Sequence, residues 1–528
     1  MAARGRGERS SARLTPRNGR MVVIVTTPRS QPWTAPLLPR AALLAFALVA
    51  ALCLFPTAAH AQDRPFEGVT LTVITQSPPY IARPVQMLAP EWEERTGATI
   101  DLVTVPFGDL YTQIMSDFAL GAGRYDVVIF ASAWMGDFAG NRYLVDITDW
   151  VLADEELAFD EIVPTYQDTV QWANRIYGIP LDGDVHTLYY RRDALENTEY
   201  QERFEETFGY PLGVPQTWEQ YRDVAEFFHA WDFDGDGRLE YGAIEAMQRG
   251  GQAFWFFLSR AAPIVCPEGV LGCLWFDPDD MTPRIDNPGF VRALEQWIEI
   301  LDVGVPGMIN FDSGDVRSQF AAGQAAVGFD WGDTGIIGST SDESTIRGQL
   351  GTAILPGSLE VYDPETGEWL THDEPNFAPF LAFGGWVGGV SVTSPHAEAA
   401  YDFLAELGSP EFSYIAVTTD ATGFNPYRPR HFEDYSRWLE MGFEQSDLAL
   451  YLSAIEASLS HPNAQLDLKL PGQPRYMDAA EVELGRALAG EVSAERALQN
   501  IATQWNRITD DIGREQQLAF YREFLGLD

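Results

Sequence analysis

The chain contains little lysine, histidine or cysteine. Among its 528 residues there are 7 histidines and 3 cysteines, and Lys469 is the only lysine. Lysine and arginine together number 35 against 77 acidic residues, which gives a formal net charge of −42. A surface this acidic repels nucleic acid and anionic lipid head groups, so neither is expected as a partner. We attribute the preference for arginine to genome composition and a saline or oxidising exterior.

The sequence also lacks the common signatures of hydrolytic enzymes. Neither G-x-S-x-G nor H-E-x-x-H occurs, and the histidines are scattered. These absences disfavour a serine hydrolase and a zinc peptidase. No pair of carboxylates stands in a recognisable catalytic setting, although a glycoside hydrolase would use such a pair. We therefore expect a protein without catalytic residues.

The only long apolar run lies near the N-terminus and is too short to cross a bilayer. Arg40 precedes an apolar stretch from Ala41 to Phe55, Pro56 ends it, and Ala59-His60-Ala61 has the small-x-small pattern of a cleavage site. A membrane span needs about 20 apolar residues. Residues 1–61 are therefore expected to be a cleaved secretory signal peptide, with Met1 or Met21 as the start. Cleavage would remove eight Arg and one Glu, a charge of +7, and take −42 to −49.

Two cysteines, Cys266 and Cys273, remain after cleavage. They stand seven residues apart around Pro267 and Gly269. In an exported protein this spacing predicts a small disulfide loop. Two cysteines without a nearby histidine pair do not make a structural zinc site.

The mature sequence begins with alternating strand and helix patterns. Strands are expected at 71–74, 100–105 and 126–130, and helices at about 84–96 and 110–120. This alternation is typical of a doubly wound α/β domain. Further on, helices are expected at 217–229, 243–262, 288–303, 396–407 and from 477 to the C-terminus, with a hairpin insertion at 357–379.

The stretch YGIPLDGDVHTLYYRRDAL, residues 177–195, organises the rest of the chain. Gly178 and Pro180 begin it, Asp182 and Asp184 follow, and a β-prone run comes next. This pattern indicates a strand that leaves one compact body and enters another. Because α/β proteins bind ligands at the carboxyl ends of strands, we expect this crossing to form the floor of a cleft.

Residues 232–240, DFDGDGRLE, resemble the start of an EF-hand calcium loop. Oxygen ligands stand at positions 1, 3, 5 and 9, a glycine stands at 6 and Arg238 at 7. Position 12 is Ala243, so the usual bidentate glutamate is missing unless Glu240 or Glu245 replaces it. The alternative is an acidic, solvated turn. The expected ligand set for one structural calcium ion is Asp232, Asp234, Asp236, Arg238 and Glu240.

Seven motifs together resemble a known family. In order, they are TLTVITQSPPY, YDVVIFAS, YGIPLDGDVHTLYYRRDAL, AAGQAAVGFDWGD, FGGWVGGVSVTSP, GFNPYRP and ALAGEVSAERALQNIATQW, within residues 68–507. They are similar to the extracellular solute-binding proteins, family 1, of bacterial ABC transporters, a maltose-binding-protein-like group. The resemblance implies a two-lobed α/β periplasmic binding protein fold (type II) with about three hinge crossings. It places the N-terminal lobe at 62–185 and 355–460 and the C-terminal lobe at 186–354 and 461–528.

The resemblance also implies a set of ligand-binding residues. Asp184 matches the family's acidic sugar-binding position, and Trp331 matches its aromatic platform. The family has charged residues in the first-lobe loop, where this chain has Ala133 and Trp134, so the sugar itself stays open. The complete expected set is Gln76, Ser77, Ser132, Trp134, Asp184, Trp331, Gly385, Trp386 and Arg428. Indole faces suit sugar C–H groups, while carboxylates and arginine bind hydroxyl groups.

The function implied is that of a periplasmic protein which binds a sugar, oligosaccharide or polyol and delivers it to an ABC permease. We expect it to act as a monomer. Two alternatives stay open: a secreted, calcium-stabilised glycoside hydrolase, and a binder of another solute such as a polyamine.

Overall fold

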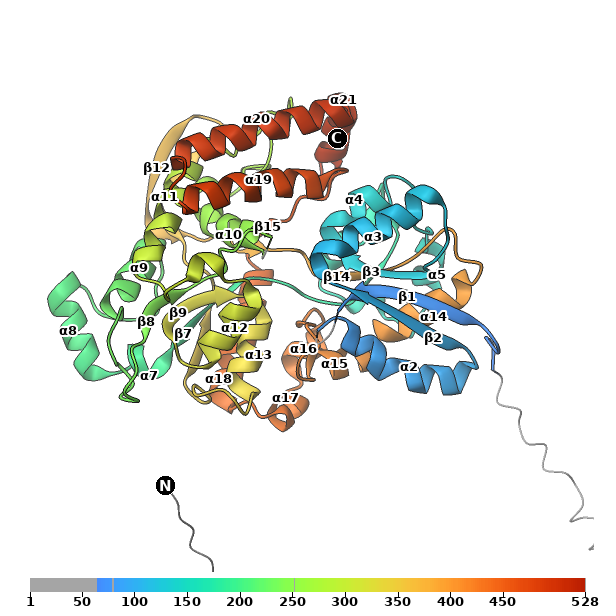
Figure 1. The fold of residues 1–528 in the computed structure, drawn as a ribbon, viewed down its shortest axis with the longest axis horizontal. Coiled ribbons are helices and arrows are strands. Elements are labelled where there is room, and N and C mark those ends of the chain that lie inside the picture. The colour runs from blue at the N-terminus through green and yellow to red at the C-terminus, as the bar shows by residue number, and fades with distance from the viewer. Residues whose placement is uncertain (1–63, 78–79, 251, 528) are drawn as a thin grey trace, which may run out of the picture. The chain divides into compact units, whose positions relative to one another are not determined.

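The computed structural model describes residues 64–527 except 78, 79 and 251 (Figure 1). The predicted signal peptide, residues 1–61, lies outside the described residues. Asp63 to Asp528 form one compact unit. Within the described ranges, none of the helices combines the length and the apolar character needed to cross a membrane.

The first lobe is built on a five-stranded sheet. Its order is β2-β1-β3-β14-β6, with β1 parallel to β2 and β3, and β14 antiparallel to both of its neighbours. The strands are β1 (Thr70–Gln76), β2 (Thr99–Val105), β3 (Val127–Ala131), β6 (Ile179–Pro180) and β14 (Trp386–Val390). Every residue of β3 is buried, as a continuous apolar run in a mostly parallel sheet predicts. The strand–helix alternation predicted for this region is confirmed.

The second lobe is built on a four-stranded sheet in the order β10-β7-β9-β8. Only β8 and β9 run parallel in it. Its strands are β7 (Thr187–Arg191), β8 (Tyr241–Ile244), β9 (Ala325–Asp330) and β10 (Leu350–Ala353). All residues of β7 and β9 are buried, so this sheet is covered on both faces.

Helices and short strands surround these sheets. Those before the first crossing are α2 (Ala82–Thr96), α3 (Phe107–Leu120), α4 (Met135–Phe138), α5 (Thr148–Ala153), α6 (Pro164–Thr169), β4 (Gln171–Trp172) and β5 (Arg175–Ile176). The second lobe then adds α7 (Arg192–Leu195), α8 (Thr198–Phe208), α9 (Trp218–Phe227), α10 (Ala253–Val265), α11 (Pro288–Glu299), α12 (Ser313–Ala321), α13 (Gly332–Thr340), β11 (Ser358–Asp363), β12 (Glu368–Asn376) and β13 (Phe380–Leu381). The remainder is α14 (Ala397–Leu407), α15 (Pro410–Val417), α16 (Pro429–Glu433), α17 (Ser436–Met441), α18 (Gln445–Leu459), β15 (Gln465–Leu466), α19 (Gln473–Leu488), α20 (Ala494–Ile512) and α21 (Arg514–Phe524).

The two lobes and their connections give the two-lobed α/β fold predicted from the sequence. The chain passes from β6 to β7 through residues 181–186 and returns from β13 to β14 through residues 382–385. It crosses again between α15, which packs on α14, and α18, which packs on β10. The C-terminal pair α19 and α20 lie side by side and pack against α10 and α11 (Figure 1).

The packing differs from the expected lobe ranges in two places. Residues 355–460 were expected in the first lobe, but the hairpin β11–β12 packs against α10 and α11, and α18 packs on β10. By these contacts, the β11–β12 hairpin and α18 belong to the second lobe. The reason is that both present apolar side chains, such as the buried Val361 and Tyr451, to helices and strands of that lobe.

Two element predictions need correction. Residues 243–262 were predicted as one helix, whereas β8 ends at Ile244 and α10 begins only at Ala253. The helix predicted at 217–229 ends at Phe227. The residues of β8 form a strand because they pair with β9, although their local pattern favours a helix. Their partners lie more than 80 positions further along the chain, so the local sequence does not reveal this pairing.

The predicted disulfide is confirmed. Cys266 and Cys273 are bonded, and both are fully buried at the end of α10. The bond closes the loop that leads out of this apolar helix.

Candidate ligand-binding cleft

A cavity of about 220 Å³ lies where the two lobes and the crossings meet. The first-lobe side and the crossings contribute Gln76, Tyr80, Ile81, Phe107, Asp184, Phe383, Trp386 and Gly423. The second lobe contributes Gly250, Gln252, Asp312, Ser313, Gly314, Arg317, Trp331 and Asp333. A molecule bound here would contact both lobes at once.

Asp184 is the acidic residue of the first crossing. It lies between β6 and β7, is 6% exposed, and its Oδ1 accepts a hydrogen bond from Asn425 Nδ2 at 3.0 Å. Burial, together with the charge of Asp182, raises the pKa of Asp184 well above its usual value. The carboxyl group can therefore carry a proton and either donate or accept a hydrogen bond.

Asp182 lies directly beneath the cavity rather than in its wall. Its Oδ1 accepts hydrogen bonds from the backbone N–H groups of Gly183, at 2.8 Å, and Asn425, at 2.5 Å. Burial raises its pKa as well, although these amide donors oppose the shift. Asp182 thus fixes the backbone of the crossing, and Asp184 faces the cavity.

Arg317 supplies the positive charge of the cavity. It lies on α12, where Asp312 and Asp315 form a capping box at the N-terminus. Its Nε donates to Asp330 Oδ2 at 2.7 Å, and its Nη2 lies 3.1 Å from Asp333 Oδ2. Arg317 is thus paired with two carboxylates that offset its charge, and the carboxylate of Asp312 leaves the cavity with a negative balance.

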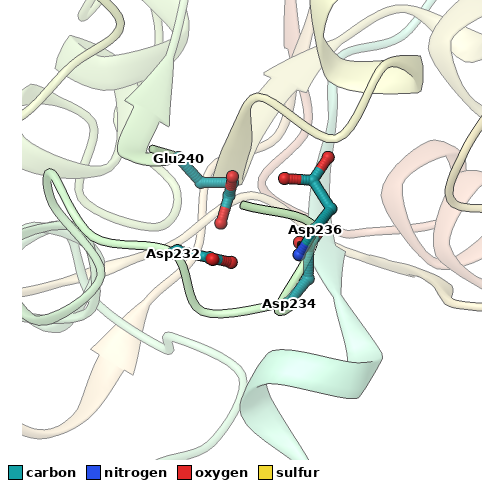
Figure 2. A group of neighbouring side chains, drawn as sticks. All are labelled: Asp232, Asp234, Asp236 and Glu240. Carbon is teal, nitrogen blue, oxygen red and sulfur yellow. Dashed lines mark hydrogen bonds between the residues drawn. The ribbon is translucent and has the colours of Figure 1, made fainter. Parts of the chain in front are cut away.

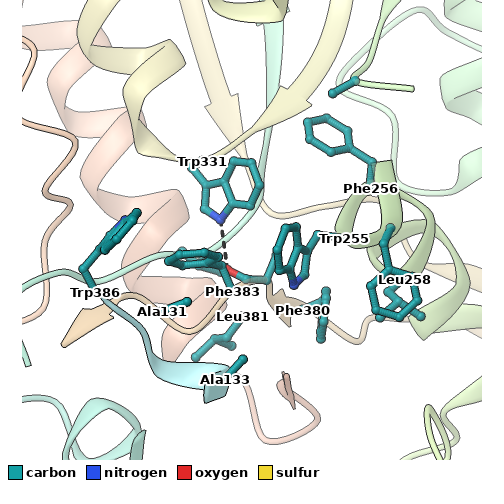
Figure 3. Packing of buried hydrophobic residues seen from close by; sticks show 14 of the residues in the cluster. Ala131, Ala133, Trp255, Phe256, Leu258, Trp331, Phe380, Leu381, Phe383 and Trp386 are labelled. Carbon is teal, nitrogen blue, oxygen red and sulfur yellow. Dashed lines mark hydrogen bonds between the residues drawn. The ribbon is translucent and has the colours of Figure 1, made fainter. Parts of the chain in front are cut away.

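Two indole rings form much of the apolar wall. Trp331 precedes α13, and its Nε1 donates to the carbonyl oxygen of Ala382 at 2.9 Å, which fixes the ring against the second crossing (Figure 3). The ring of His186 packs edge-on against it, with centroids 4.2 Å apart. Trp386 begins β14 and packs against Phe383 at 5.2 Å.

Four of the residues predicted to bind ligand line this cavity. They are Gln76, Asp184, Trp331 and Trp386. Ser77 follows Gln76, and its backbone N–H donates to the carbonyl oxygen of Val105. That Ser77 and the other members of the predicted set bind ligand stays a prediction.

Gly385 lies behind the wall, where the second crossing touches the first. Its φ is +85°, and a Cβ there would lie 2.3 Å from the carbonyl oxygen of Asp182. Only glycine fits this approach. Its predicted role therefore becomes one of backbone packing around the site.

Three predicted residues point elsewhere. Ser132 donates through Oγ to the carbonyl oxygen of Phe383 and lines a different cavity. Trp134 is 3% exposed and packs in the first lobe against Phe107, with ring centroids 5.8 Å apart. Arg428 is 1% exposed and directs its guanidinium at the carbonyl oxygens of Leu157, Ala158 and Gly408. Their geometry gives Trp134 and Arg428 structural positions outside this cavity.

Sequence reasoning missed several lining residues. The chief omissions are Tyr80, Phe107, Gln252, Asp312, Arg317, Asp333 and Phe383. The capping box at the start of α12 and the acidic residue after Trp331 were visible signals for two of them. The aromatic residues carry no local signal, because they reach the cavity only through contacts between lobes.

The acidic loop predicted to hold calcium is separate from this cavity. Ligand atoms of Asp232, Asp234, Asp236 and Glu240 lie within 4.8 Å of one another (Figure 2). Arg191 Nη2 also donates to Asp234, at 3.2 Å.

Glu245, considered as a replacement ligand, is committed to other partners. It is fully buried, accepts from Arg260 at 2.6 Å and from Trp297 at 2.8 Å, and lies outside the acidic cluster. Only Glu240 of the two suggested replacements is placed with the aspartates.

Comparison with known proteins agrees with this architecture. A family model described as bacterial extracellular solute-binding protein matches residues 78–412. The chain belongs to this family. The family resemblance and the two-lobed fold inferred from the sequence are thereby confirmed.

Individual relatives are distant. A probable ABC transporter-binding protein of Deinococcus radiodurans is 24% identical over 379 residues, which cover 70% of this chain and 79% of that protein. A mannitol-binding protein of Pseudomonas aeruginosa is 23% identical over 57% of this chain and 63% of its own length.

Solved structures show the same fold. A solute-binding protein of Agrobacterium radiobacter K84 in complex with ribitol aligns with a TM-score of 0.67 and 22% identity, covering 84% of this chain and all of that one. Maltose-bound T. maritima MalE3 aligns with a TM-score of 0.64 and 21% identity, covering 83% of this chain and all of that one.

Proposed function

We propose that this protein binds a sugar, oligosaccharide or polyol between its lobes and delivers it to the permease of an ABC importer. The main support for this proposal is the cavity whose wall contains both the carboxyl group of Asp184 and the indoles of Trp331 and Trp386. Carboxyl groups bind hydroxyls, and indole faces cover the C–H faces of the same molecule. Relatives named for mannitol, ribitol and maltose support this ligand class.

Transport requires no chemistry at the site. Closure of the two lobes around a ligand would present one shape to the permease, and opening would release the ligand unchanged. The family's extracellular character and the predicted signal peptide support a periplasmic protein, working as a monomer with membrane-bound permease subunits.

The test is a thermal-shift screen of the protein against sugars, polyols and polyamines, with recovery of each ligand afterwards. A ligand at a hundred times its dissociation constant stabilises the protein by about 2.7 kcal/mol, which gives a clear shift. A saturable shift with a sugar or polyol recovered intact supports the proposal. A sugar that is consumed would support the hydrolase instead.

A cationic solute such as a polyamine is the second candidate. It is favoured by the negative balance of the cavity, where Asp312 faces the ligand space, Arg317 is already paired, and Asp184 can give up its proton to a bound cation. In the same screen, a shift with spermidine or putrescine and with no neutral sugar would select this candidate.

We further propose that the loop of residues 232–240 holds one structural calcium ion. Three aspartates and Glu240 supply carboxylates in the spacing of an EF-hand start, and Arg238 follows at position 7. The ion would offset the repulsion between these carboxylates. Adding calcium should raise the melting temperature, chelator should lower it, and Asp236→Asn should reduce the difference. Equal melting temperatures with calcium and chelator would contradict the site.

A further inference from the structure

We infer that Phe107, Trp255 and Phe383 form an aromatic partition which limits the ligand to a single sugar ring or an open-chain polyol of similar size. The inference deepens the proposed function and rests on it. It concerns which members of the sugar and polyol class fit the cavity.

A second cavity lies close to these residues, since Gly384 in its wall directly follows Phe383 in the chain. It measures about 280 Å³ and is lined, among others, by Ala133, Leu381, Asp467 and Lys469. Residues from both lobes line it, as they do the first cavity. Together the two cavities would offer space for more than one ring.

Trp255 of α10 contacts residues that line each of the two cavities. Its Nε1 donates to Asp467 Oδ2 at 2.6 Å, and Asp467 lines the second cavity. Its ring packs against Phe107, Phe383 and Trp331, which line the first cavity, with centroids at 6.4, 5.4 and 6.3 Å. In Figure 3, Phe383 lies between Trp331 above it and Leu381 and Ala133 below it, and Trp255 lies beside Phe383.

Phe383 is held firmly in the partition. Its φ of +73° lies in the left-handed region, which a bulky residue adopts only where its surroundings require it. Ser132 Oγ donates to its carbonyl oxygen at 2.9 Å, and its ring packs against Phe107 with centroids 5.7 Å apart. Phe107 also stacks on Trp134, so first-lobe and second-lobe rings meet in one continuous layer.

The size of the first cavity then sets the size of the ligand. Its volume of about 220 Å³ falls below the roughly 300–1,000 Å³ of sites for drug-sized molecules. The indole of Trp255 is 2% exposed and packs with Phe107 and Phe383 into one layer, and we expect this layer to block a second ring. A disaccharide would have to displace this layer in order to bind.

The test is calorimetric titration of the protein with ribitol, mannitol, glucose, maltose and maltotriose. For the wild-type protein we expect binding of at least one of the first three, with maltose and maltotriose at least tenfold weaker. In Trp255→Ala, which removes one ring of this layer, the ratio of maltose affinity to that of the small ligand should rise at least tenfold. Trp505→Ala is the matched control, because Trp505 is also buried and donates to the carbonyl oxygen of Tyr476. Its ring packs against Phe254, Trp275, Phe276 and Tyr476, none of which lines the first cavity.

Each outcome decides the inference. Wild-type protein that binds maltose or maltotriose as tightly as any small ligand overturns the partition and leaves the proposed function standing. An unchanged affinity ratio in folded Trp255→Ala overturns the role of Trp255. If that variant does not fold, Phe383→Leu takes its place, with the same result expected. Binding of none of the five ligands, with a response to polyamines, overturns the proposed function and the inference with it.

Discussion

Two neighbouring carboxylates, Asp182 and Asp184, take different roles because of which atoms surround them. Asp184 faces the cavity, so Asp184→Asn should weaken ligand binding. Loss of one hydrogen bond to a neutral group costs about 0.5–1.5 kcal/mol, which is roughly a twofold to tenfold change in affinity. Calorimetric titration with the ligand found in the screen measures it. If the folded variant binds the ligand as tightly as the wild type, Asp184 does not contribute to ligand binding.

Asp182→Asn serves as the contrast at the adjacent position. Because Asp182 accepts hydrogen bonds from the backbone N–H groups of Gly183 and Asn425, its replacement should lower the free energy of unfolding. A net loss of about 1 kcal/mol is expected, since the amide oxygen of asparagine is a weaker acceptor for these two N–H groups than a carboxyl group shared with Asp184. Thermal unfolding of the two variants side by side separates the roles. A melting temperature equal to that of the wild type would contradict the role given to Asp182.

We propose that Trp331, which lines the cavity from the second lobe, is the aromatic platform for the ligand. Trp331→Ala removes a ring that lines the cavity, and we expect an affinity loss of about 2 kcal/mol, or roughly thirtyfold. Trp438→Ala is a suitable control, because Trp438 is equally buried and donates to a carbonyl oxygen, that of His431, outside the cavity. Equal ligand affinity of the two variants would contradict the platform role.

Sequence reasoning identified the residues whose role is set by their own segment. Asp184 and Trp331 stand at strand ends, where a cleft was expected, and both line the cavity. Trp134 and Arg428 occupy similar local positions, but their surroundings are chosen by distant segments. The rings of Tyr111 and Phe138 enclose the first, and carbonyl groups enclose the second. Such partners are invisible in a single sequence.

At the scale of elements, the disulfide fixes the loop after α10. A cross-link over so short a loop stabilises the folded state by about 2.5 kcal/mol in the chain-entropy model. The double variant Cys266→Ser/Cys273→Ser should therefore melt at a lower temperature while still binding ligand, because neither cysteine lines the cavity. Reductant should lower the melting temperature of the wild type in the same way and leave that of the variant unchanged. An effect of reductant on the variant would contradict this.

Most elements were predictable because their pattern is local. The helix α2 ends at Gly97, whose φ of +82° suits glycine, and the C-terminal helices follow the apolar periodicity seen in the sequence. The exceptions depend on tertiary pairing. The strand β8 exists because it pairs with β9, and the lobe to which α18 belongs depends on its contact with β10. A helix reveals its apolar face in the sequence, but not which sheet that face will cover.

At the scale of the whole molecule, buried acids should make stability depend on pH. Burial raises the pKa values of Asp330 and Asp467 to about 6 and that of Glu481 to about 7. In the unfolded chain these groups ionise near 3.8 and 4.5. Between about pH 4 and 7 the folded state therefore binds more protons, so the free energy of unfolding falls as pH rises. The formal charge of −42 acts in the same direction.

At low pH the free energy of unfolding should fall again, because some acids gain hydrogen bonds on folding. The pKa values of Asp146 and Asp280 are lowered, through hydrogen bonds from Thr148 and Thr282 among others, and their stabilising effect is lost as pH falls below about 4. We expect the melting temperature to be highest near pH 4 and to decline toward pH 8, as measured by calorimetry. A melting temperature that rises from pH 5 to pH 8 would contradict the assignment of these buried acids.

The central claim is that the space between the lobes binds one small polyhydroxylated solute and releases it unchanged. The most direct measurement is a calorimetric titration of the wild type and Asp184→Asn with ribitol, mannitol and glucose, followed by recovery of the ligand. We expect one binding site per chain, weaker binding to Asp184→Asn than to the wild type, and recovery of the ligand intact. It would be contradicted if all three gave no heat with the wild-type protein, or if the variant bound as tightly as the wild type.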